Sequence, residues 1–547
     1  MIKRFKPWWQ QDKRYRTLTQ ALLLALLPVV CCFVRCALDG ETISGVWLPG
    51  SRWNDELFYY KQVEGILEFG YPQGYFGFNE SHALNLSFAS WSPVIVFPWV
   101  LWGLIFGWNL WSPIVCNIVI TSLVCFVFVW LVKPAWKQLG VLALLFSLYT
   151  PFTRYILSGM AEVICFCMLI LFYGLAVNYL NRSRIYKLVL LFIMGVLMTL
   201  MRPYLLLFLL LPAYLWIRRN GWRGALGSAA VIGAALGLYA CIKHYLGAEY
   251  FEPLYFTDWV DAFFERGIFG GLRFCLARLY GMGRSFLEAM VRGIRTGEPM
   301  GAYFCGYMLI LCILAGQSFL DWRRLKALGR ASADSVVRDE EEVAARRKLR
   351  NGLVVQLHLV FSFAAMFFAL LLMYKLEAGS RHLLTFMTAG IFMIALMDTK
   401  YFKKAVLTGA AFAYFFSYMA VDPLYYELPY RQESEARQFS EWEELFDARL
   451  ELEREAGVPN FDNSVIWVYQ DADPDGTLKQ TKWQLLYGLP EGFGISCCMP
   501  EYILENFGSL QSKYLATTAG GRIDRMCGEE GYREVGRDQE LVIYRLR

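Results

Sequence analysis

Two neighbouring carboxylates near the start of the chain are the first candidates for chemistry. Asp55 and Glu56 follow the first hydrophobic run, and the aromatic pair Tyr59 and Tyr60 comes directly after them. A carboxylate held at a membrane surface beside an apolar wall can have a raised pKa and act as a general base. At the start of a surface helix, the same acids would instead cap the N-terminus. Spacing alone leaves both roles open.

Other charged residues stand at the ends of later hydrophobic runs. Arg154 closes one run and Glu162 opens the next, whereas Arg202 lies between two others. Arg381 and His382 come just before a late run. A charge beside the bilayer is costly unless it is paired or reaches water, and a cation there can meet a lipid phosphate. A local Arg154–Glu162 pair, a snorkelling Arg202 and ordinary headgroup contacts would also explain these residues.

The composition of the chain predicts the kind of scaffold that positions these residues. Of its 547 residues, 56% are hydrophobic and 18% charged, against about 25% charged in a typical soluble domain. The apolar residues recur in runs of roughly 15–22, the length of a membrane-spanning helix. The sequence therefore predicts an all-α polytopic membrane protein and excludes both a soluble globular enzyme and an outer-membrane barrel.

The hydrophobic runs predict eleven transmembrane helices, near 17–37, 111–132, 139–153, 161–180, 187–201, 203–217, 225–245, 302–320, 352–373, 382–398 and 405–421. One further apolar stretch, 92–107, is short and contains Pro93 and Pro98. Counting it as a span would invert every later loop, so it is expected to be a re-entrant or interfacial helix on the outer side.

The loop charges predict the orientation of these helices. The basic-rich connections are expected inside, as the positive-inside rule requires: 133–137, 181–187, 217–223, 321–350 and 398–404. The N-terminus is then cytoplasmic, and two long outer loops cover 38–110 and 246–301. The second carries six arginines between apolar residues, which favours amphipathic helices at the outer headgroup level.

The charge balance predicts two domains. Residues 422–547 contain 13 Lys/Arg and 24 Asp/Glu, a balance of −11, whereas residues 1–421 have a balance of +16. We expect a transmembrane domain over 1–421 and a small extracytoplasmic α/β domain over 422–547, with a charged helix at 431–457, a strand at 463–470 and a hairpin at 532–546. The basic residues lie in short loops rather than on one patch, so nucleic acid is not an expected partner.

The cysteines give no metal-binding pattern. Most of the 14 lie in or beside apolar runs, where Cys behaves as a small hydrophobe. In the C-terminal region, Cys527 could form a disulfide with Cys497 or Cys498 if that region is extracytoplasmic. The centres of the predicted spans are nearly free of charge, with His358 the main ionisable residue, which disfavours an ion-coupled transporter.

The sequence resembles the GT-C superfamily of polytopic glycosyltransferases, which includes protein O-mannosyltransferases and lipid A aminoarabinose transferases. The resemblance covers about 1–420 and rests on six features: Asn54-Asp55-Glu56, Tyr59-Tyr60, the apolar segment from Pro93 to Gly107, Thr153-Arg154 through Glu162, Arg202-Pro203 and Arg381-His382. His382 stands where Tyr is commoner in the superfamily, and Glu162 stands where Asp is commoner. No Trp-Trp-Asp signature is present, so protein N-glycosylation is not expected.

The resemblance implies an inverting glycosyltransferase that moves a sugar from a polyprenyl-phosphate donor to an envelope glycan, lipid or protein acceptor. Asp55 would be the general base with Glu56 as its substitute, and Glu162 would orient the acceptor or Asp55. Arginines would bind the lipid phosphate, so a divalent metal is not required. The implied substrate-binding residues are Arg154, Arg202, Arg381, His382, Tyr59, Tyr60 and an arginine of 266–295.

Three alternatives remain open from the sequence. A polymerase or ligase of lipid-linked glycans would need a larger acceptor groove. A lipid-linked sugar flippase or transporter would need hydrophilic residues through the span centres. A non-catalytic envelope scaffold would not need Asp55. The sugar, the acceptor, the anomer, the form of the donor phosphate and the oligomeric state do not follow from the sequence.

Overall fold

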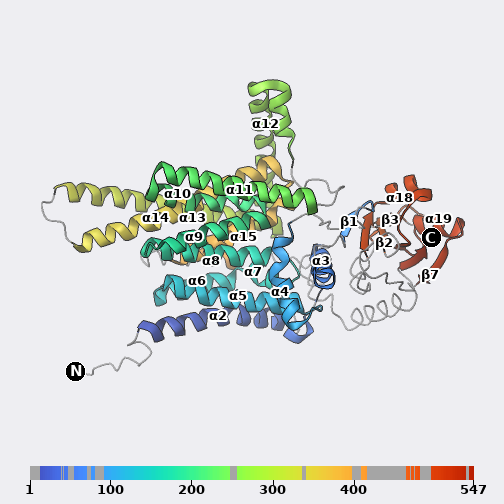
Figure 1. Ribbon diagram of the computed structural model, residues 1–547, viewed down its shortest axis with the longest axis horizontal. Helices are drawn as coiled ribbons and strands as arrows, with labels where there is room; N and C mark the ends of the chain where they lie inside the picture. Colours follow the sequence, from blue (N-terminus) through green and yellow to red (C-terminus); the bar gives the residue numbers. More distant parts are fainter. Residues whose placement is uncertain are drawn as a thin grey trace.

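The structure is a computed structural model of the chain (Figure 1). It describes residues 13–38, 40, 42–46, 48, 55–70, 76–80, 92–246, 256–334, 340–396, 408–414, 464–468, 470–472, 475–480, 494–537 and 541–547. The predicted helix at 431–457 and most of the predicted span at 405–421 lie outside these ranges.

A bundle of apolar helices forms the larger part of the molecule, which confirms a multi-pass membrane protein. Within the described residues, six helices are long and apolar enough to span a membrane: α2 (Lys13–Leu38), α5 (Ser112–Val132), α8 (Glu162–Asn181), α11 (Trp222–Leu246), α13 (Pro299–Asp334) and α14 (Glu340–Met373). Leu22, Leu26 and Val30 of α2 are 52–57% exposed, as expected for side chains that face lipid.

The remaining predicted spans are shorter or broken. The run at 139–153 forms α6 (Trp136–Leu148) and α7 (Thr150–Ile156), which meet at an angle of 70°. The run at 203–217 begins as the 3₁₀-helix η4 (Pro203–Leu209) and continues as α10 (Leu210–Asn220), whereas α9 (Ile185–Met201) and α15 (Leu376–Leu396) are continuous. A proline near the start of α7 and of η4 explains both breaks, because proline donates no backbone hydrogen bond.

The stretch at 92–107 forms a short helix at one end of the bundle. It consists of η3 (Pro93–Val96) and α4 (Phe97–Phe106). Ten α-helical residues extend about 15 Å, half the thickness of a hydrocarbon core. α3 (Asp55–Phe69) packs against α4 (Figure 1).

The loop at 246–301 contains α12 (Asp258–Thr296), which projects sideways from the bundle in Figure 1. Its backbone breaks at Gly267, where φ is 67° and ψ is −178°. The Arg278 guanidinium lies 3.4 Å from Asp258, so the two arms of α12 fold against each other. Only glycine readily adopts the backbone conformation found at Gly267.

The C-terminal region contains a six-stranded mixed sheet, which confirms the expected α/β class. Its order is β1-β5-β2-β6-β8-β7. The first four strands in this order are parallel to one another, whereas β8 is antiparallel to both of its neighbours, β6 and β7. The helices α18 (Pro500–Asn506) and α19 (Arg522–Glu529) accompany it. The strands are β1 (Phe76–Phe78), β2 (Ser464–Val468), β5 (Gly494–Cys498), β6 (Tyr514–Thr518), β7 (Arg533–Arg537) and β8 (Leu541–Arg545), and a separate pair is formed by β3 (Gln470–Ala472) and β4 (Leu478–Gln480).

The first long loop enters this sheet. β1 pairs with β5, although more than 400 residues separate them. Two residues beyond β1, the buried carboxylate of Glu80 accepts hydrogen bonds from the backbone amides of Gln511 and Ser512, at 2.9 and 2.6 Å. The loop that begins with α3 is therefore fixed to the C-terminal sheet by backbone pairing and by a carboxylate.

The three C-terminal cysteines are free thiols in the structure. Burial raises the pKa of Cys497 and of Cys498 to about 12, and burial also raises the pKa of Cys527 to about 12. Buried thiols with raised pKa values are protonated at neutral pH and chemically inert.

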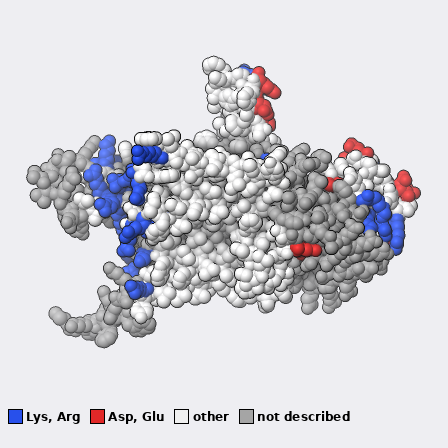
Figure 2. Space-filling view, viewed as in Figure 1, with Lys and Arg blue, Asp and Glu red and all other residues white. Residues whose placement is uncertain are grey.

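Basic residues gather at the end of the bundle that lies opposite the C-terminal sheet (Figure 2). Exposed arginines lie between α8 and α9 (Arg182 and Arg184) and at the end of α10 (Arg218 and Arg219). This distribution agrees with the loop charges used to predict the orientation. The orientation itself remains a prediction.

Candidate functional site

The candidate site is assembled from four separate parts of the chain. α3 contributes Asp55 and Glu56 from its first turn, and α8 contributes Glu162 from its first residue. Arg202 lies at the junction of α9 and η4, and Arg381 lies near the start of α15. The sequence placed all five at the ends of helices, and the structure brings them together near the end of the bundle beside the C-terminal sheet (Figure 1).

Asp55 and Arg381 form the accessible part of the site. Arg381 Nη1 donates a hydrogen bond to Asp55 Oδ2. Their side chains are 24% exposed for Asp55 and 18% exposed for Arg381, whereas Glu56 and Glu162 are fully buried. Of the three candidate carboxylates, Asp55 is therefore the one that a substrate can reach.

Beneath this pair lies a fully buried ion pair. Arg202 Nη2 donates to Glu162 Oε1 at 2.7 Å, and both side chains are 0% exposed. The Arg381 Nε atom lies 3.9 Å from the same Glu162 oxygen, so one carboxylate faces two guanidinium groups. In a low-dielectric setting, such an arrangement holds each group firmly in place.

Tyr59 extends this network back to α3. Arg202 Nη2 lies 3.1 Å from the Tyr59 hydroxyl and donates to it. Burial raises the pKa of Tyr59, so the side chain remains a neutral phenol at physiological pH. Asp55 and Tyr59, one turn apart on α3, therefore contact the two arginines at different depths.

Glu56 has a positioning contact of its own. Its Oε1 atom accepts a hydrogen bond from the backbone N–H of Gly159 at 2.7 Å. Asn117 Nδ2 donates to the carbonyl of Ser158 at 2.9 Å and supports the same turn. A side chain at Gly159 would meet Leu48 and Glu56 at 3.0–3.3 Å. Glu56 thus holds the turn before Glu162 against α3, a role that the sequence did not reveal.

The other predicted binding residues lie in aromatic surroundings. Arg154 Nη1 donates to the Tyr303 hydroxyl at 2.6 Å. The ring of His382 lies between Tyr204 and Tyr374, with centroids 4.9 and 5.2 Å away. The ring of Tyr60 stacks on the ring of Trp108, with their centroids 5.3 Å apart.

Sequence reasoning missed the three tyrosines that contact Arg154 and His382. Tyr204 was detectable, because it follows Arg202 and Pro203 directly. Tyr374 was also detectable, because it begins the polar stretch with Lys375 and Glu377 that precedes Arg381, whereas Tyr303 lies in an apolar run with no local signal.

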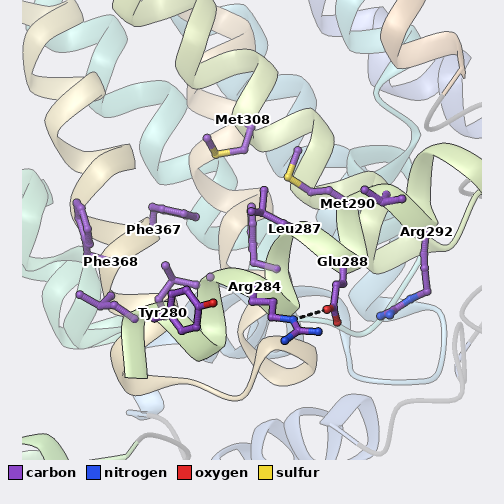
Figure 3. Close-up of a pocket in the computed structure, with 14 residues that line it drawn as sticks. Tyr280, Arg284, Leu287, Glu288, Met290, Arg292, Met308, Phe367 and Phe368 are labelled. Carbon is purple, nitrogen blue, oxygen red and sulfur yellow. Dashed lines mark hydrogen bonds and ion pairs between the residues drawn. The ribbon is translucent and has the colours of Figure 1, made fainter. Parts of the chain in front are cut away.

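The structure also contains a large apolar groove. It has a volume of about 1010 Å³ and is formed by α12, α13 and α14 (Figure 3). On α13, Met308 lines the groove and lies five residues after Tyr303, which contacts Arg154. On α14, Leu371 lines the groove and lies three residues before Tyr374, which contacts His382. Arg284 also lines the groove, ion-paired to Glu288 at 2.8 Å.

Within the part of the chain that the structure describes, no group of three or more His, Cys, Asp or Glu side chains is arranged to hold a metal ion. The charged groups of the site are instead carboxylates paired with arginines.

The fold and the site define a multi-pass helical membrane protein with a buried charge network near one end of its bundle. No protein-family model and no curated protein matches the chain. Among solved structures, it is similar to the archaeal oligosaccharyltransferase AglB from Archaeoglobus fulgidus in complex with an inhibitory peptide and a dolichol-phosphate. The identity is 13% and the TM-score 0.46, with 94% of this chain and 70% of that chain covered.

It is also similar to ArnT from Cupriavidus metallidurans bound to undecaprenyl phosphate, with 10% identity and a TM-score of 0.42 over 97% of this chain and 98% of that chain. Both are GT-C superfamily membrane glycosyltransferases, the superfamily that the sequence resembles. With TM-scores below 0.5, these similarities assign no role to any residue.

Proposed function

We propose that the protein is an inverting glycosyltransferase that moves a sugar from a polyprenyl-phosphate donor to a cell-envelope acceptor on the outer face of the membrane. The single observation that carries this proposal is the contact between Asp55 and Arg381. It places a reachable carboxylate beside a reachable guanidinium, as transfer from a phosphate leaving group requires.

The proposed reaction is a single displacement. The acceptor hydroxyl attacks the anomeric carbon, and Asp55 takes up its proton. The bond between that carbon and the phosphate oxygen breaks, and its electron pair leaves with the polyprenyl phosphate. Attack opposite the leaving group inverts the anomeric configuration.

Arg381 is the proposed ligand of the leaving phosphate. A guanidinium has five N–H donors, and a fork of two matches two phosphate oxygens. Arg381 Nη1 contacts Asp55, and the Arg381 side chain is 18% exposed. Arg381 can therefore bind a phosphate while it remains beside the base. The charge that develops on the phosphate needs no metal ion for neutralisation.

Glu162 and Arg202 act in this scheme as positioning residues. Both are fully buried, so neither contacts a substrate in this arrangement. Glu162 holds Arg381 from one side while Arg202 balances its charge. Tyr59 and Glu56 secure α3, and with it Asp55, to the same network.

The apolar groove provides a place for the polyprenyl chain of the donor. Its lining is mostly apolar, and its volume exceeds that of most drug-sized pockets. On α13, the groove-lining Met308 lies about 8 Å along the helix axis from Tyr303, which contacts Arg154.

The proposal is tested by donor turnover. Purified protein is incubated with a panel of polyprenyl-phosphate sugars and a lipid extract of cell envelopes as the acceptor source. Release of polyprenyl phosphate that depends on the extract supports the proposal. Absence of turnover with every donor, from protein that binds undecaprenyl phosphate, would favour a carrier or scaffold role over an enzyme.

A further inference from the structure

The helix α12 presents a continuous apolar face. Gly267 divides α12 into a short arm (258–266) and a long arm (268–296), and the long arm is helical throughout. Exposed apolar side chains recur along the long arm at intervals of three, four or seven positions, so they share one face of the helix. Phe269, near the tip, is 87% exposed. We define the apolar stripe of α12 as Phe269, Leu272, Leu276, Tyr280, Leu287 and Val291.

The long arm crosses the bundle close to the end that carries the C-terminal sheet (Figure 1). Phe286 of α12 stacks on Phe304 of α13, with ring centroids 4.3 Å apart. Phe304 is five residues from Pro299, the first residue of α13, which corresponds to about 8 Å along the helix axis. Amphipathic helices at a membrane surface bury their apolar face about 5–10 Å into the boundary between headgroups and acyl chains. The long arm therefore lies at the depth that such helices occupy.

The apolar stripe faces deeper into the bundle. Leu287 and Val291 line the apolar groove together with Met308 of α13 (Figure 3). Met308 lies four residues beyond Phe304, which is about 6 Å farther from the start of α13. Because the long arm is one continuous helix, its projecting part, with Phe269 near the tip, faces in the same direction. Across a bilayer, this direction runs from the headgroups toward the acyl chains.

The short arm covers the opposite side of the long arm. Gly271 and Arg278 lie about half a turn away from the stripe, and both contact the short arm. A side chain at Gly271 would overlap the short arm, and Arg278 lies 3.4 Å from Asp258. Asp261 and Glu265 of the short arm are exposed. Figure 2 shows acidic side chains of α12 on the side nearer the C-terminal sheet and uncharged surface on the side nearer the basic end of the bundle. The projecting part of α12 thus has an acidic side and an apolar side, as an interfacial element requires.

The direction of the stripe decides what can cover it. A second copy in the same membrane would lie beside the bundle, so it could not cover a face that points along the bundle axis. A water-soluble partner would have to enter the bilayer to reach the same face. Phe368 of α14 is exposed and lines the groove together with Leu287, so the stripe is continuous with the lipid-facing surface of the bundle. Acyl chains are therefore the occupant that fits the stripe.

We propose that the projecting part of α12 is inserted into the membrane leaflet next to the C-terminal sheet. The apolar stripe contacts the acyl chains of this leaflet, and the short arm faces the headgroups and water. Arg273 is exposed beside the stripe and is long enough to reach lipid phosphates. Because Leu287 and Val291 belong to both the stripe and the groove, acyl chains that lie along α12 also reach the groove. The arm contacts lipid in this way whether or not the protein transfers a sugar.

Spin labels test this insertion in the full-length protein. The protein is placed in nanodiscs that hold one copy each, in a background without native cysteines whose melting temperature matches that of the wild type. Labels are attached at Leu272→Cys and Leu276→Cys on the stripe, and at Asp261→Cys and Glu265→Cys on the short arm as matched exposed controls. The measurement is the collision of each label with oxygen, which enters the acyl region, and with a water-soluble nickel chelate, which does not.

Labels on the stripe should lose access to the chelate and keep access to oxygen, whereas the chelate should reach the control labels. Equal access of the chelate to both sets of labels would overturn the insertion. Exclusion of the chelate from both sets would mean that α12 is covered on both sides, which would overturn the proposed arrangement with one side in lipid and the other in water.

Charges placed on the stripe give a second readout. Leu272→Glu with Leu276→Glu should expel the arm from the acyl region, so a label at Phe269→Cys should gain access to the chelate. The matched control is Asp261→Asn with Glu265→Gln, which changes two charges on the short arm and should leave the label at Phe269→Cys protected. If this label also stays protected in the first variant, the stripe does not hold the arm in the bilayer and the proposal fails.

Discussion

The side chain of Arg381 donates a hydrogen bond to the carboxylate of Asp55, although 326 positions separate the two residues in the chain. This contact joins the first turn of α3 to the start of α15. It also joins the proposed base to the proposed phosphate ligand, so a change at either residue alters the charge that the other one faces. Predictions about the two residues must therefore be tested with substitutions that separate the loss of charge from the loss of shape.

Substitutions at Arg381 should separate charge from geometry. Arg381→Ala removes both the charge and the donors, so donor turnover should fall strongly. Arg381→Lys keeps a point charge without the fork of donors, so activity should fall only in part. Both kcat and KM should change, because the negative charge on the leaving phosphate grows in the transition state. The kinetics are measured with a polyprenyl-phosphate sugar in detergent. Wild-type kinetics for both variants would mean that Arg381 only anchors its helix and does not bind the donor phosphate.

The buried pair of Glu162 and Arg202 should dominate the stability of the site. Arg202→Met leaves the Glu162 carboxylate with less compensation in a buried setting, and the cost of breaking such a pair is about 3–5 kcal/mol. Adding Glu162→Gln should recover part of this loss, because the uncompensated charge is then removed. The measurement is the melting temperature of the purified protein in detergent. If the double variant is no more stable than Arg202→Met, the loss of stability does not come from the uncompensated charge of Glu162.

The C-terminal sheet should lose stability in acid through Asp524. Burial alone would raise the pKa of this carboxyl, but hydrogen bonds from Arg537, Tyr544 and the Gly520 amide together lower it. An acid whose pKa is lower in the folded state than its unfolded value of about 3.9 stabilises the fold above that pH. This contribution disappears as the pH falls through the folded pKa.

Hydrogen exchange can check this pH dependence. Amide protection in β6 and β8 should decrease as the pH falls below about 4, after correction for the intrinsic exchange rate. Asp524→Asn should be less protected at neutral pH and should show a flatter profile. A profile for Asp524→Asn parallel to that of the wild type would assign the acid sensitivity to another group.

Cysteine labelling tests the predicted orientation. In a background without native cysteines, an impermeant thiol reagent added outside the cell should modify a cysteine introduced at Glu501, in α18. It should not modify one introduced at Arg346, in α14. Both positions are exposed in the structure, so access to the side chain is matched. The reverse labelling pattern would place the proposed active site on the inner face.

The sequence was informative where single residues conflict with their surroundings. A charge next to an apolar run stands out because burial in lipid is costly, which is why Asp55, Glu162, Arg202 and Arg381 were all found from the sequence. Their partners could not be found in that way. Local spacing left open a pair of Glu162 with Arg154, yet the Glu162 carboxylate bonds to Arg202, 40 residues away.

Long-range pairing also explains which contacts the sequence did not reveal in the loop at 38–110. The contact of Glu56 with the Gly159 amide depends on how α3 docks on the bundle, and no local pattern encodes it. Likewise, a three-residue strand such as β1 is too short to show periodicity, so its place beside β5 appears only in the folded structure. The helix breaks before α7 and before η4 were visible in the sequence, because a proline stands at the start of each of these two helices.

The most direct test of the central claim is the rate of sugar transfer by Asp55→Asn. This substitution conserves shape and leaves an oxygen for Arg381, but it removes the ability to accept the acceptor's proton. Because the Asp55 side chain is 24% exposed, folding should be near normal. Glu68→Gln, at an exposed position on the same helix, is the control. We predict that transfer by Asp55→Asn falls by about 10²–10⁴-fold while Glu68→Gln retains wild-type activity. Near-normal transfer by well-folded Asp55→Asn would contradict the account and remove Asp55 from the role of general base.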